Sequence, residues 1–303
     1  MRFRLWKAVP VTDPVGAVSV LSTGTVRLRP QQVAGGGGPM MWWLFTTRRW
    51  APPLPINFYV IEHREGLVLF DTGQDRASMT DPGYYPGGVT GLVYRRLSQF
   101  DIGPDQTLPA LLAAAGYSVD DVRTTVVSHL HQDHVGGVAE LTKSEVVTSE
   151  QEWRCLQAPR PERNGLLARH IRVPGVSWCP VGFAPTTDPD LAPFTAAHDL
   201  FGDGSLVLLP TPGHTPGSVS LLVRRPGRAP LLLVGDLTFS VDHLDREQLP
   251  GIGERVPLLE TTRKLNALRQ RQPDLVVLPA HDPTAADRLA GRARPAPHHA
   301  GPS

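Results

Sequence analysis

The run Ser128-His-Leu-His-Gln-Asp-His-Val-Gly-Gly137 gathers three imidazoles and one carboxylate into a single short segment. It follows Thr124-Thr-Val-Val-Ser128, whose β-branched residues predict a short buried strand. An extended backbone after that strand points His129 and His131 to the same side, because alternate side chains share a face. The two imidazoles are therefore expected to approach one point at the end of the strand.

The same run holds two more candidate ligands, at a predicted turn into a helix over Val135 to Leu141. Asp133 and His134 aim there at a second point beside the first. The spacing differs from that of His-Glu-x-x-His metalloproteases, in which a helix sets up the pair. The run thus predicts a metal site at the end of a strand.

Three further candidate ligands follow apolar runs later in the chain. His214 lies in the turn Thr211-Pro-Gly-His-Thr-Pro-Gly217, and Asp236 ends the run Leu231-Leu-Leu-Val-Gly-Asp. His281 ends an apolar run in the same way. A carboxylate has two oxygens, so Asp236 can offer one to each of two ions and bridge them.

Imidazole and carboxylate together are the ligands of zinc or a similar borderline divalent metal. The seven groups are too many for one tetrahedral ion, but they suit two adjacent ions that share a carboxylate and a hydroxide. The sequence therefore predicts a dinuclear metallohydrolase with two divalent ions, zinc first among them. A lone histidine is usually a satisfied polar residue, and we interpret the others so: His63, His170, His198, His243, His298 and His299.

Size and composition are those of an ordinary globular protein. The chain has 303 residues, of which 41% are hydrophobic and 19% charged. A net charge of +1, with no basic stripe among aromatics, argues against a nucleic-acid partner. No run approaches the roughly 20 apolar residues that cross a bilayer, and the start lacks the apolar run of a signal peptide, so we expect no membrane partner.

The two cysteines, Cys155 and Cys179, are too few for a disulfide framework. We expect both to be structural, with their pairing left open, and we expect a cytoplasmic location. The expected partner is a small-molecule substrate. The oligomeric state is left open, a homodimer included.

Apolar and turn patterns predict one domain over residues 1–289, with insertions at about 31–55 and 75–103 and a disordered tail over 290–303. Other strands are predicted at Val15–Leu28, Ile56–Glu62, Leu67–Phe70, Val146–Ser149, Leu206–Leu209, Ser218–Val223, Leu231–Val234 and Leu275–Leu278. Other helices are predicted at Leu108–Ala115, Glu150–Leu156 and Pro257–Arg271. Residues 164–199 are too irregular to assign. The pattern indicates two sheets packed face to face with helices outside.

The first insertion carries four glycines followed by Met40-Met-Trp-Trp-Leu-Phe45. Such apolar residues are either core or a loop that covers a pocket, and we favour the lid because connections this long are usually functional or disordered. Trp42, Trp43 and Phe45 would then contact an apolar tail or ring of a substrate. The alternative is simple core packing.

In order and spacing, His129-x-His-x-Asp-His134 and the later His214, Asp236 and His281 resemble the metallo-β-lactamase superfamily. The resemblance covers roughly Ile56 to Asp282. It implies an α/β protein with a four-layer αβ/βα sandwich, the metallo-β-lactamase fold. Two mixed sheets would pack face to face, with the metals at one edge of the sheets.

The resemblance also implies a role for each residue of the site. His129, His131 and His214 would hold the first metal, Asp133, His134 and His281 the second, and Asp236 would bridge both. Asp71, in Phe70-Asp-Thr-Gly73, matches an upstream superfamily motif. We expect it to accept a hydrogen bond from a ligand imidazole.

Within the superfamily, three segments are similar to the N-acyl homoserine lactone lactonases: residues 61–73, 129–137 and 280–282. Those enzymes usually carry a tyrosine three residues after the bridging aspartate, and its hydroxyl contacts the substrate. Here that position is Phe239, and a phenyl ring cannot donate a hydrogen bond. Three tyrosines of the second insertion could supply a hydroxyl, although we favour packing or surface roles for them: Tyr84, Tyr85 and Tyr94.

The leading hypothesis is a quorum-quenching hydrolase that opens a lactone or ester, N-acyl homoserine lactone first, through a hydroxide shared by the two ions. Asp133 would carry a proton to the leaving oxygen, Asp236 would be the second catalytic carboxylate, and Phe239 would contact the substrate. The alternatives on the same site are a phosphotriester or phosphodiester hydrolase and a glyoxalase II-like thioesterase. β-Lactamase activity is less favoured, because those enzymes generally lack a bridging aspartate at this position. A non-enzymatic alternative is a metal-dead ligand sensor, which the complete ligand set disfavours.

Overall fold

Two mixed β-sheets form the centre of the molecule in the computed structural model, which describes residues 13–36 and 38–291. The first sheet has seven strands, in the order β4 (Ser98–Asp101), β1 (Val15–Leu28), β2 (Leu54–His63), β3 (Gly66–Phe70), β5 (Val122–Val126), β6 (Glu145–Ser149) and β7 (Ser177–Val181). The second has six, in the order β13 (Val276–Leu278), β12 (Leu231–Leu233), β11 (Val219–Val223), β10 (Leu206–Pro210), β9 (Ala196–Asp199) and β8 (Ala184–Pro185).

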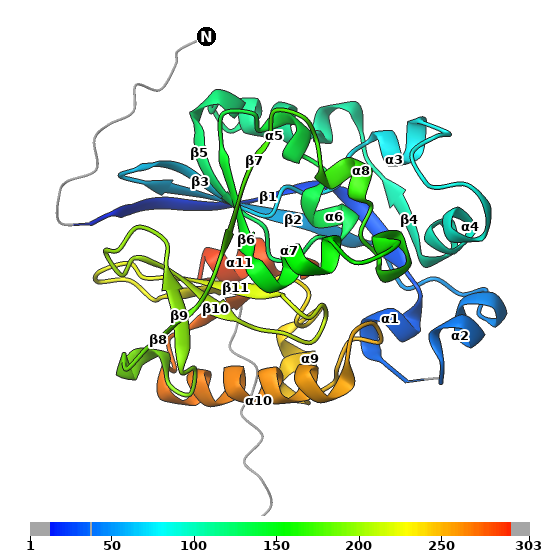
Figure 1. Ribbon diagram of the computed structural model, residues 1–303. Helices are drawn as coiled ribbons and strands as arrows, with labels where there is room; N and C mark the ends of the chain where they lie inside the picture. Colours follow the sequence, from blue (N-terminus) through cyan, green and yellow to red (C-terminus); the bar gives the residue numbers. More distant parts are fainter. Residues whose placement is uncertain (1–12, 37, 292–303) are drawn as a thin grey trace, which may run out of the picture.

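Helices cover the outer faces of both sheets. The longer ones are α2 (Met40–Thr46), α4 (Gly88–Leu97), α5 (Leu108–Ala114), α7 (Glu150–Leu156) and α10 (Arg255–Arg271). The short ones are α1 (Pro30–Ala34), α3 (Ala77–Thr80), α6 (Gln132–Val135), α8 (Ala168–Ile171), α9 (Val241–Asp245) and α11 (Ala285–Leu289). Figure 1 shows α5 over the first sheet and α10 along the opposite side of the second, which confirms the predicted four-layer sandwich.

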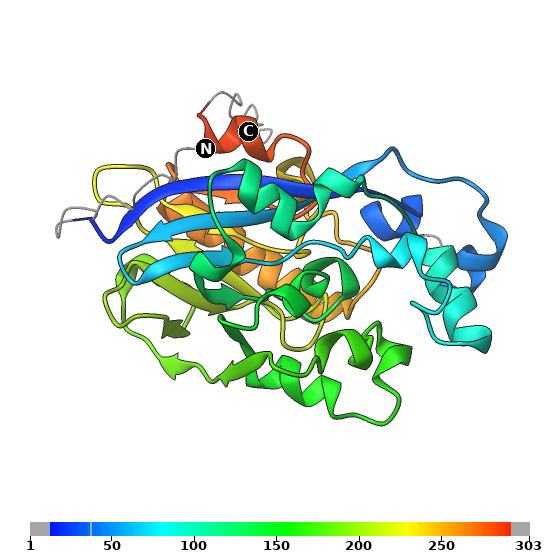
Figure 2. The ribbon, with the colours of Figure 1, turned by 90° about the horizontal axis from the view of Figure 1, so that it is seen from above.

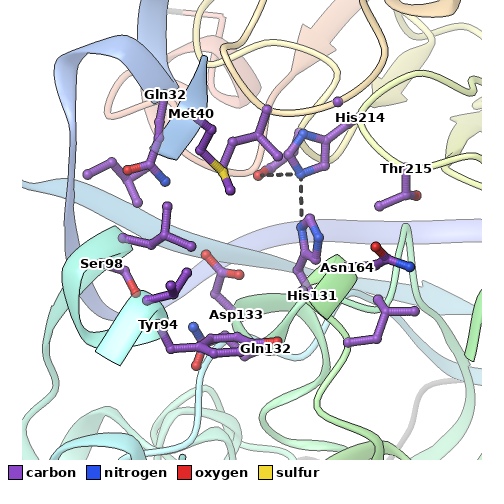
Figure 3. A pocket seen from close by; sticks show the side chains of 18 of the residues that line it. Gln32, Met40, Tyr94, Ser98, His131, Gln132, Asp133, Asn164, His214 and Thr215 are labelled. Carbon is purple, nitrogen blue, oxygen red and sulfur yellow. Dashed lines mark hydrogen bonds and ion pairs between the residues drawn. The ribbon is translucent and has the colours of Figure 1, made fainter. Parts of the chain in front are cut away.

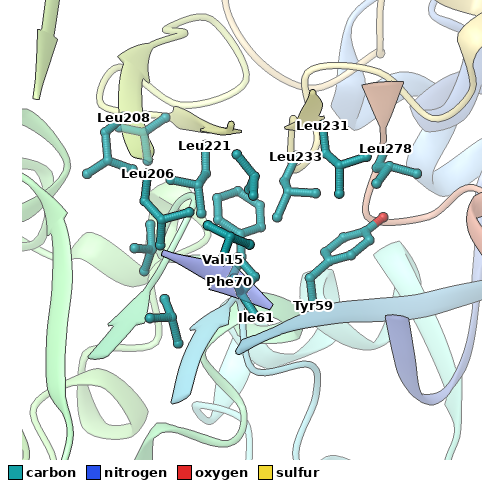
Figure 4. Close-up of a cluster of buried hydrophobic side chains, with 14 of the residues drawn as sticks. Val15, Tyr59, Ile61, Phe70, Leu206, Leu208, Leu221, Leu231, Leu233 and Leu278 are labelled. Carbon is teal, nitrogen blue, oxygen red and sulfur yellow. The ribbon is translucent and has the colours of Figure 1, made fainter. Parts of the chain in front are cut away.

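The register of β10 explains how one strand serves two hydrophobic layers. Successive side chains of a strand point to opposite faces, so a strand covered on both faces is apolar throughout. Leu206 and Leu208 face the space between the sheets, whereas Val207 and Leu209 face the layer of α10. The layer between the sheets is the main core, and both sheets contribute to it (Figure 4).

Parallel strand pairs bring several strand ends to one edge of the molecule. β5 pairs in parallel with β3 and β6, and β12 pairs in parallel with β13. Parallel neighbours have their carboxyl ends at the same edge, so the loops that follow β12 and β13 lie side by side. The view in Figure 2 shows the helices of the two insertions, α1, α2 and α4, gathered at one end of the molecule.

Some predictions of local structure were wrong. In place of a helix over Val135 to Leu141, the chain forms α6 and then a single 3₁₀ turn over Val138–Glu140. Gly136 and Gly137 lie between them against residues 72–75, and a Cβ on Gly136 would lie 2.2 Å from the backbone nitrogen of Asp75. Tertiary contact therefore breaks the helix at the two glycines.

The two insertions also contain more regular structure than the sequence predicted. Residues 31–55 include most of α1 and all of α2, and residues 75–103 include α3, α4 and the edge strand β4. The unassigned residues 164–199 contribute α8, β7, β8 and β9. Within the described ranges no helix combines the length and hydropathy needed to cross a membrane. The predicted tail lies outside the described residues from position 292 onward, and the predicted limits of the domain, residues 1–289, stay a prediction.

Candidate metal centre

Seven predicted ligands, drawn from four separate segments, come together at one edge of the sheets. Four lie between β5 and the end of α6, His214 lies in the turn between β10 and β11, and Asp236 and His281 follow β12 and β13. Their ligand atoms form three overlapping groups, each with all atoms within 4.8 Å of one another. The groups are His129, His131 and His214; His129, His134 and Asp236; and Asp133, His134 and His281.

The first group consists of three imidazoles whose nitrogens converge. Nε2 of His129 lies 3.0 Å from Nδ1 of His131, and that atom lies 3.0 Å from Nε2 of His214. Figure 3 shows His131 and His214 pointing toward each other, with Asp133 pointing into the same space. Three nitrogens that face one point are a suitable set for a divalent metal.

Asp236 lies between this group and the group of Asp133, His134 and His281. Its Oδ1 is 3.3 Å from Nε2 of His134 and 3.3 Å from Nε2 of His281. Its Oδ2 is 3.6 Å from Nε2 of His214. Asp133 also approaches His281, with Oδ2 3.5 Å from Nε2 of that imidazole. The two oxygens of Asp236 thus face different groups.

Several of these atoms are buried without a hydrogen-bond partner in the described chain. They are Nε2 of His134, Nε2 of His281 and Oδ1 of Asp236. A buried polar atom without a partner is costly, and a buried charge more so, unless it is paired or coordinates a metal. The unpartnered atoms face a common point and belong to residue types that bind divalent metals, so the site fits such ions.

The pKa shifts show that positive charge is favoured in the group around Asp236. Burial favours the protonated carboxyl of Asp236, but His281 and His134 outweigh it and hold its pKa well below the ordinary value. Burial opposes protonation of His281, yet Asp236 and Asp133 raise its pKa to about 10. Without a metal, the carboxylates here favour protonation of the neighbouring imidazoles. A bound divalent cation would supply that positive charge in place of the protons.

In the first group the pKa values of the imidazoles are lowered instead of raised. Burial lowers the pKa of His129 well below its ordinary value, and the neighbouring imidazoles of His134, His131 and His214 add to the effect. Burial likewise lowers the pKa of His214 to about 3. These imidazoles are neutral near pH 7, which is the form that binds a metal.

Asp71 makes the contact predicted for it. Its Oδ2 lies 2.8 Å from Nδ1 of His134, so the imidazole is oriented with Nε2 toward the centre. Ser128 donates to the same carboxylate, through its backbone nitrogen at 2.7 Å and its hydroxyl at 2.9 Å. Asp71 has φ of 62°, a left-handed conformation that is uncommon for a residue other than glycine and is concentrated at functional sites.

His281 is oriented by the backbone of strand β2. Its Nδ1 lies 2.8 Å from the carbonyl oxygen of Pro55, so Nδ1 donates and Nε2 is left to face the centre.

Four of the candidate ligands line a cavity of about 420 Å³. Its polar side includes His131, Asp133, His214 and Asp236. Its apolar wall comes from β1, α2, α4, β4 and the segment after β12: Leu28, Met40, Val93, Leu97, Phe100 and Phe239. Figure 3 shows Met40 on the side of the cavity away from Asn164. A ligand with one polar, hydrolysable end and one apolar end would fit this division.

The predicted substrate contacts divide in two. Phe239 lines the cavity and stacks on His281, with ring centroids 5.4 Å apart and planes at 17°. Trp42, Trp43 and Phe45 are not among the lining residues: Trp43 is buried in α2, while Trp42 and Phe45 are 68% and 43% exposed on its outer side.

Met40 lines the cavity in place of the three aromatic residues, because the segment is a helix. Met40, Trp43 and Leu44 have the i, i+3, i+4 spacing of one helical face, on which Trp43 and Leu44 are buried and Met40 lines the cavity while remaining 36% exposed. This spacing was visible in the sequence and could have identified Met40.

Sequence reasoning missed a loop that closes one side of the cavity. Asn164 and Gly165 line the cavity beside His131. A Cβ on Gly165 would lie 2.5 Å from Nε2 of His131, and Gly165 has φ of 88°, so only glycine allows the loop to pass this close. No local pattern in residues 164–199 pointed to this role.

The three candidate tyrosines pack in the interior near the cavity. Tyr84, Tyr85 and Tyr94 form a buried cluster with Leu167. Tyr94 lines the cavity, but its hydroxyl donates to the carbonyl oxygen of Glu162 at 2.9 Å. The packing role favoured from the sequence is therefore confirmed for all three.

Comparison with known proteins decides the family. The sequence profile of the Metallo-beta-lactamase superfamily matches residues 51–281. The chain belongs to the metallo-beta-lactamase superfamily. The superfamily resemblance inferred from the ligand spacing is thereby confirmed.

A relative within this superfamily is similar over most of the chain. It is the N-acyl homoserine lactonase AttM of Rhizobium radiobacter, which is 31% identical over 234 residues, 77% of this chain and 83% of that protein.

Solved structures of lactonases have the same metallo-beta-lactamase fold. An N-acyl homoserine lactone hydrolase with the product N-hexanoyl-L-homoserine at its catalytic metal centre superimposes with a TM-score of 0.71. It has 19% sequence identity, and the match covers 92% of this chain and 97% of that one. AidC, a dizinc quorum-quenching lactonase, matches with a TM-score of 0.60 and 19% identity over 89% of this chain and 88% of its own. At these identities the likeness is one of fold.

Proposed function

We propose that this chain is a dinuclear metal-dependent hydrolase that opens N-acyl homoserine lactones. The observation that carries the proposal is the convergence of seven donor side chains, four of which line a cavity with an apolar wall. The lactonase named above, 31% identical over most of the chain, supports the lactone as the substrate.

Each of the two outer ligand groups is assigned to one metal ion. His129, His131 and His214 would hold one ion, and Asp133, His134 and His281 would hold the other. Asp236 would bridge them, since its two oxygens face different groups. We propose zinc for both ions, because imidazole and carboxylate are donors that zinc commonly binds.

Bound there, two divalent ions would polarise a carbonyl oxygen and lower the pKa of an adjacent water. The chain would supply the proton transfer through Asp133, which lines the cavity. Burial favours the protonated form of Asp133, but His281 and His134 keep its pKa below the ordinary value, so it is ionised. Its carboxylate oxygen can take a proton and pass it to the leaving oxygen of the opened ring.

The apolar wall would position the acyl chain. Met40, Val93 and Leu97 present side chains to the cavity from α2 and α4. Phe239 would contact the ring of the substrate without donating a hydrogen bond, since it is a phenyl group stacked on His281. Stabilisation of the leaving oxygen would then rest on the polar floor of the site.

The test is a hydrolysis panel with metal-loaded protein. It contains N-acyl homoserine lactones of several chain lengths, aryl esters, a thioester, an aryl phosphotriester and a phosphodiester. We expect ring opening of the lactones to exceed the other reactions in kcat/KM. If another class of substrate is hydrolysed and the lactones are not, the proposed substrate is wrong but the proposed metal site stands. If the protein binds no metal, it would be a ligand sensor and not an enzyme.

We also propose a cytoplasmic location and a small-molecule substrate as the partner. Cys155 and Cys179 are both free thiols in the structure, which suits a reducing compartment.

A further inference from the structure

Glu152 is a buried carboxylate to which the proposed reaction gives no role. It lies in the first turn of α7, its side chain is fully buried, and it borders the cavity beside the candidate ligands. It does not belong to any of the three ligand groups. A buried carboxylate is retained at a cost unless several donors compensate it, so the identity of its donors is informative.

The donors come from two segments that carry metal ligands. Oε1 of Glu152 accepts a hydrogen bond from the backbone nitrogen of Leu130 at 3.0 Å. Oε2 accepts from the hydroxyl of Thr215 at 2.7 Å and from the backbone nitrogen of Gly217 at 3.1 Å. Leu130 stands between His129 and His131 in the chain, and Thr215 follows His214. One carboxylate therefore joins the segments that present all three imidazoles of the first group.

The turn that carries His214 also fixes the position of Glu152. Its backbone nitrogen donates to the hydroxyl of Ser149 at 3.0 Å, and that hydroxyl donates to the carbonyl oxygen of Gly217 at 2.6 Å. A Cβ on Gly217 would lie 2.0 Å from the nitrogen of Glu152, so glycine is required for this close approach. Helix α7 and the His214 turn are thus locked together at the point from which the carboxylate reaches Leu130.

We propose that Glu152 is a positioning residue for the first metal ion, setting the distance between the His129–His131 segment and His214. The inference rests on the proposed metal centre, because it concerns the ligands of one of the two ions. A residue that served only to cap α7 would direct its carboxylate to the start of that helix. The carboxylate of Glu152 instead binds donors on two other segments, both of which carry ligands of the first group.

The principal test is the variant Glu152→Gln, measured by metal binding. The amide oxygen can still accept from Leu130, but the amide nitrogen would then face the donors of Thr215 and Gly217. We expect affinity for the first ion to fall about 10- to 100-fold, the usual effect of losing a partner that orients ligands, with the second ion unaffected. Stepwise zinc titration of the metal-free protein against a chelator gives both dissociation constants. Anomalous scattering at limiting zinc shows which position loses occupancy.

Glu150→Gln is the matched control, because it makes the same chemical change in the same turn of α7 on an exposed side chain. We expect both dissociation constants to match those of the parent protein. A folded Glu152→Gln protein with unchanged affinity for the first ion would overturn the proposal. So would a loss spread equally over both ions.

A milder pair of variants covers the case in which Glu152→Gln does not fold. Thr215→Val removes one donor to Oε2, and Thr215→Ser keeps the hydroxyl. We expect weaker binding of the first ion in the valine variant and recovery in the serine variant. Equal affinities in the two variants would count against the proposal.

Zinc binding also separates this inference from the proposed function. A parent protein that binds two ions but opens no lactone would refute the lactonase proposal and leave the role of Glu152 intact. A parent protein that opens lactones with two ions, and whose Glu152→Gln variant binds both equally well, would refute only the role of Glu152.

Discussion

Asp236 is the single residue on which the two halves of the proposed metal centre meet. Its oxygens lie 3.3 to 3.6 Å from ring nitrogens of His134, His281 and His214. A buried charge is costly unless it is compensated, so the carboxylate needs positive charge beside it, whereas a neutral imidazole does not. Replacing it therefore tests both ions at once.

We expect Asp236→Ala to lose at least one bound ion per chain and to lower kcat/KM for lactones by 100-fold or more, about 3 kcal/mol of transition-state stabilisation. Metal content by mass spectrometry and initial rates with a hexanoyl lactone measure the two effects. Asp274→Ala, on an exposed aspartate before β13, is the control and should match the parent. Full activity in the Asp236→Ala protein would refute the assignment of this site.

Phe239 is the residue at which this chain departs from the pattern of the lactonases it resembles. It is 5% exposed, stacks on His281 and lines the cavity, so a hydroxyl added to its ring would lie near the site. We expect Phe239→Tyr to raise kcat for lactones about fivefold, the effect of one hydrogen bond of ~1 kcal/mol. Phe100→Tyr, elsewhere on the cavity wall, is the control. An unchanged or lower rate would show that the hydroxyl has no use here.

At the scale of elements, α4 shows what an insertion contributes to the site. Its inner side presents Val93, Tyr94 and Leu97 to the cavity, while Val89 is 70% exposed. Glycines at the start of the segment hid the helix from sequence reasoning, because glycine is a poor helix former. Local propensity did not predict this helix, which in the structure packs against α2 and β4.

The inner side of α4 should limit the length of acyl chain. We expect Val93→Phe to narrow the cavity and to raise KM for a decanoyl lactone more than for a butanoyl lactone, by about tenfold in the ratio of kcat/KM values. Val89→Phe places the same bulk one turn earlier, at a position that is 70% exposed and does not line the cavity, and should leave the ratio unchanged. Equal loss for both lactones in the Val93→Phe protein would place the acyl chain elsewhere.

At the scale of the whole molecule, the layer between the sheets holds the strand ends that carry the site. Leu221 lies in this layer, fully buried between residues of both sheets (Figure 4). We expect Leu221→Ala to lower the free energy of unfolding by 2–5 kcal/mol, the range for a buried leucine replaced by alanine. Denaturant unfolding of the metal-free protein measures it. Leu92→Ala, at a leucine that is 44% exposed, should change the free energy by less than about 0.5 kcal/mol.

The superfamily, the sandwich and the seven candidate ligands could be predicted from the chain, through short-range patterns together with a resemblance to a known spacing. Strands appear as runs of β-branched and apolar residues, and His129 to His134 are neighbours in the sequence. His214, Asp236 and His281 each follow an apolar run, and the resemblance to a known spacing connected them.

Only the folded chain established which surfaces face the cavity. Trp42 and Met40 are two residues apart, yet only Met40 lines the cavity, because α2 turns their side chains in different directions. The contacts of Glu152 with Leu130 and Thr215 join residues 22 and 63 positions apart. Such contacts depend on how α7 packs against a turn distant in the sequence, and no local preference of the backbone encodes that packing.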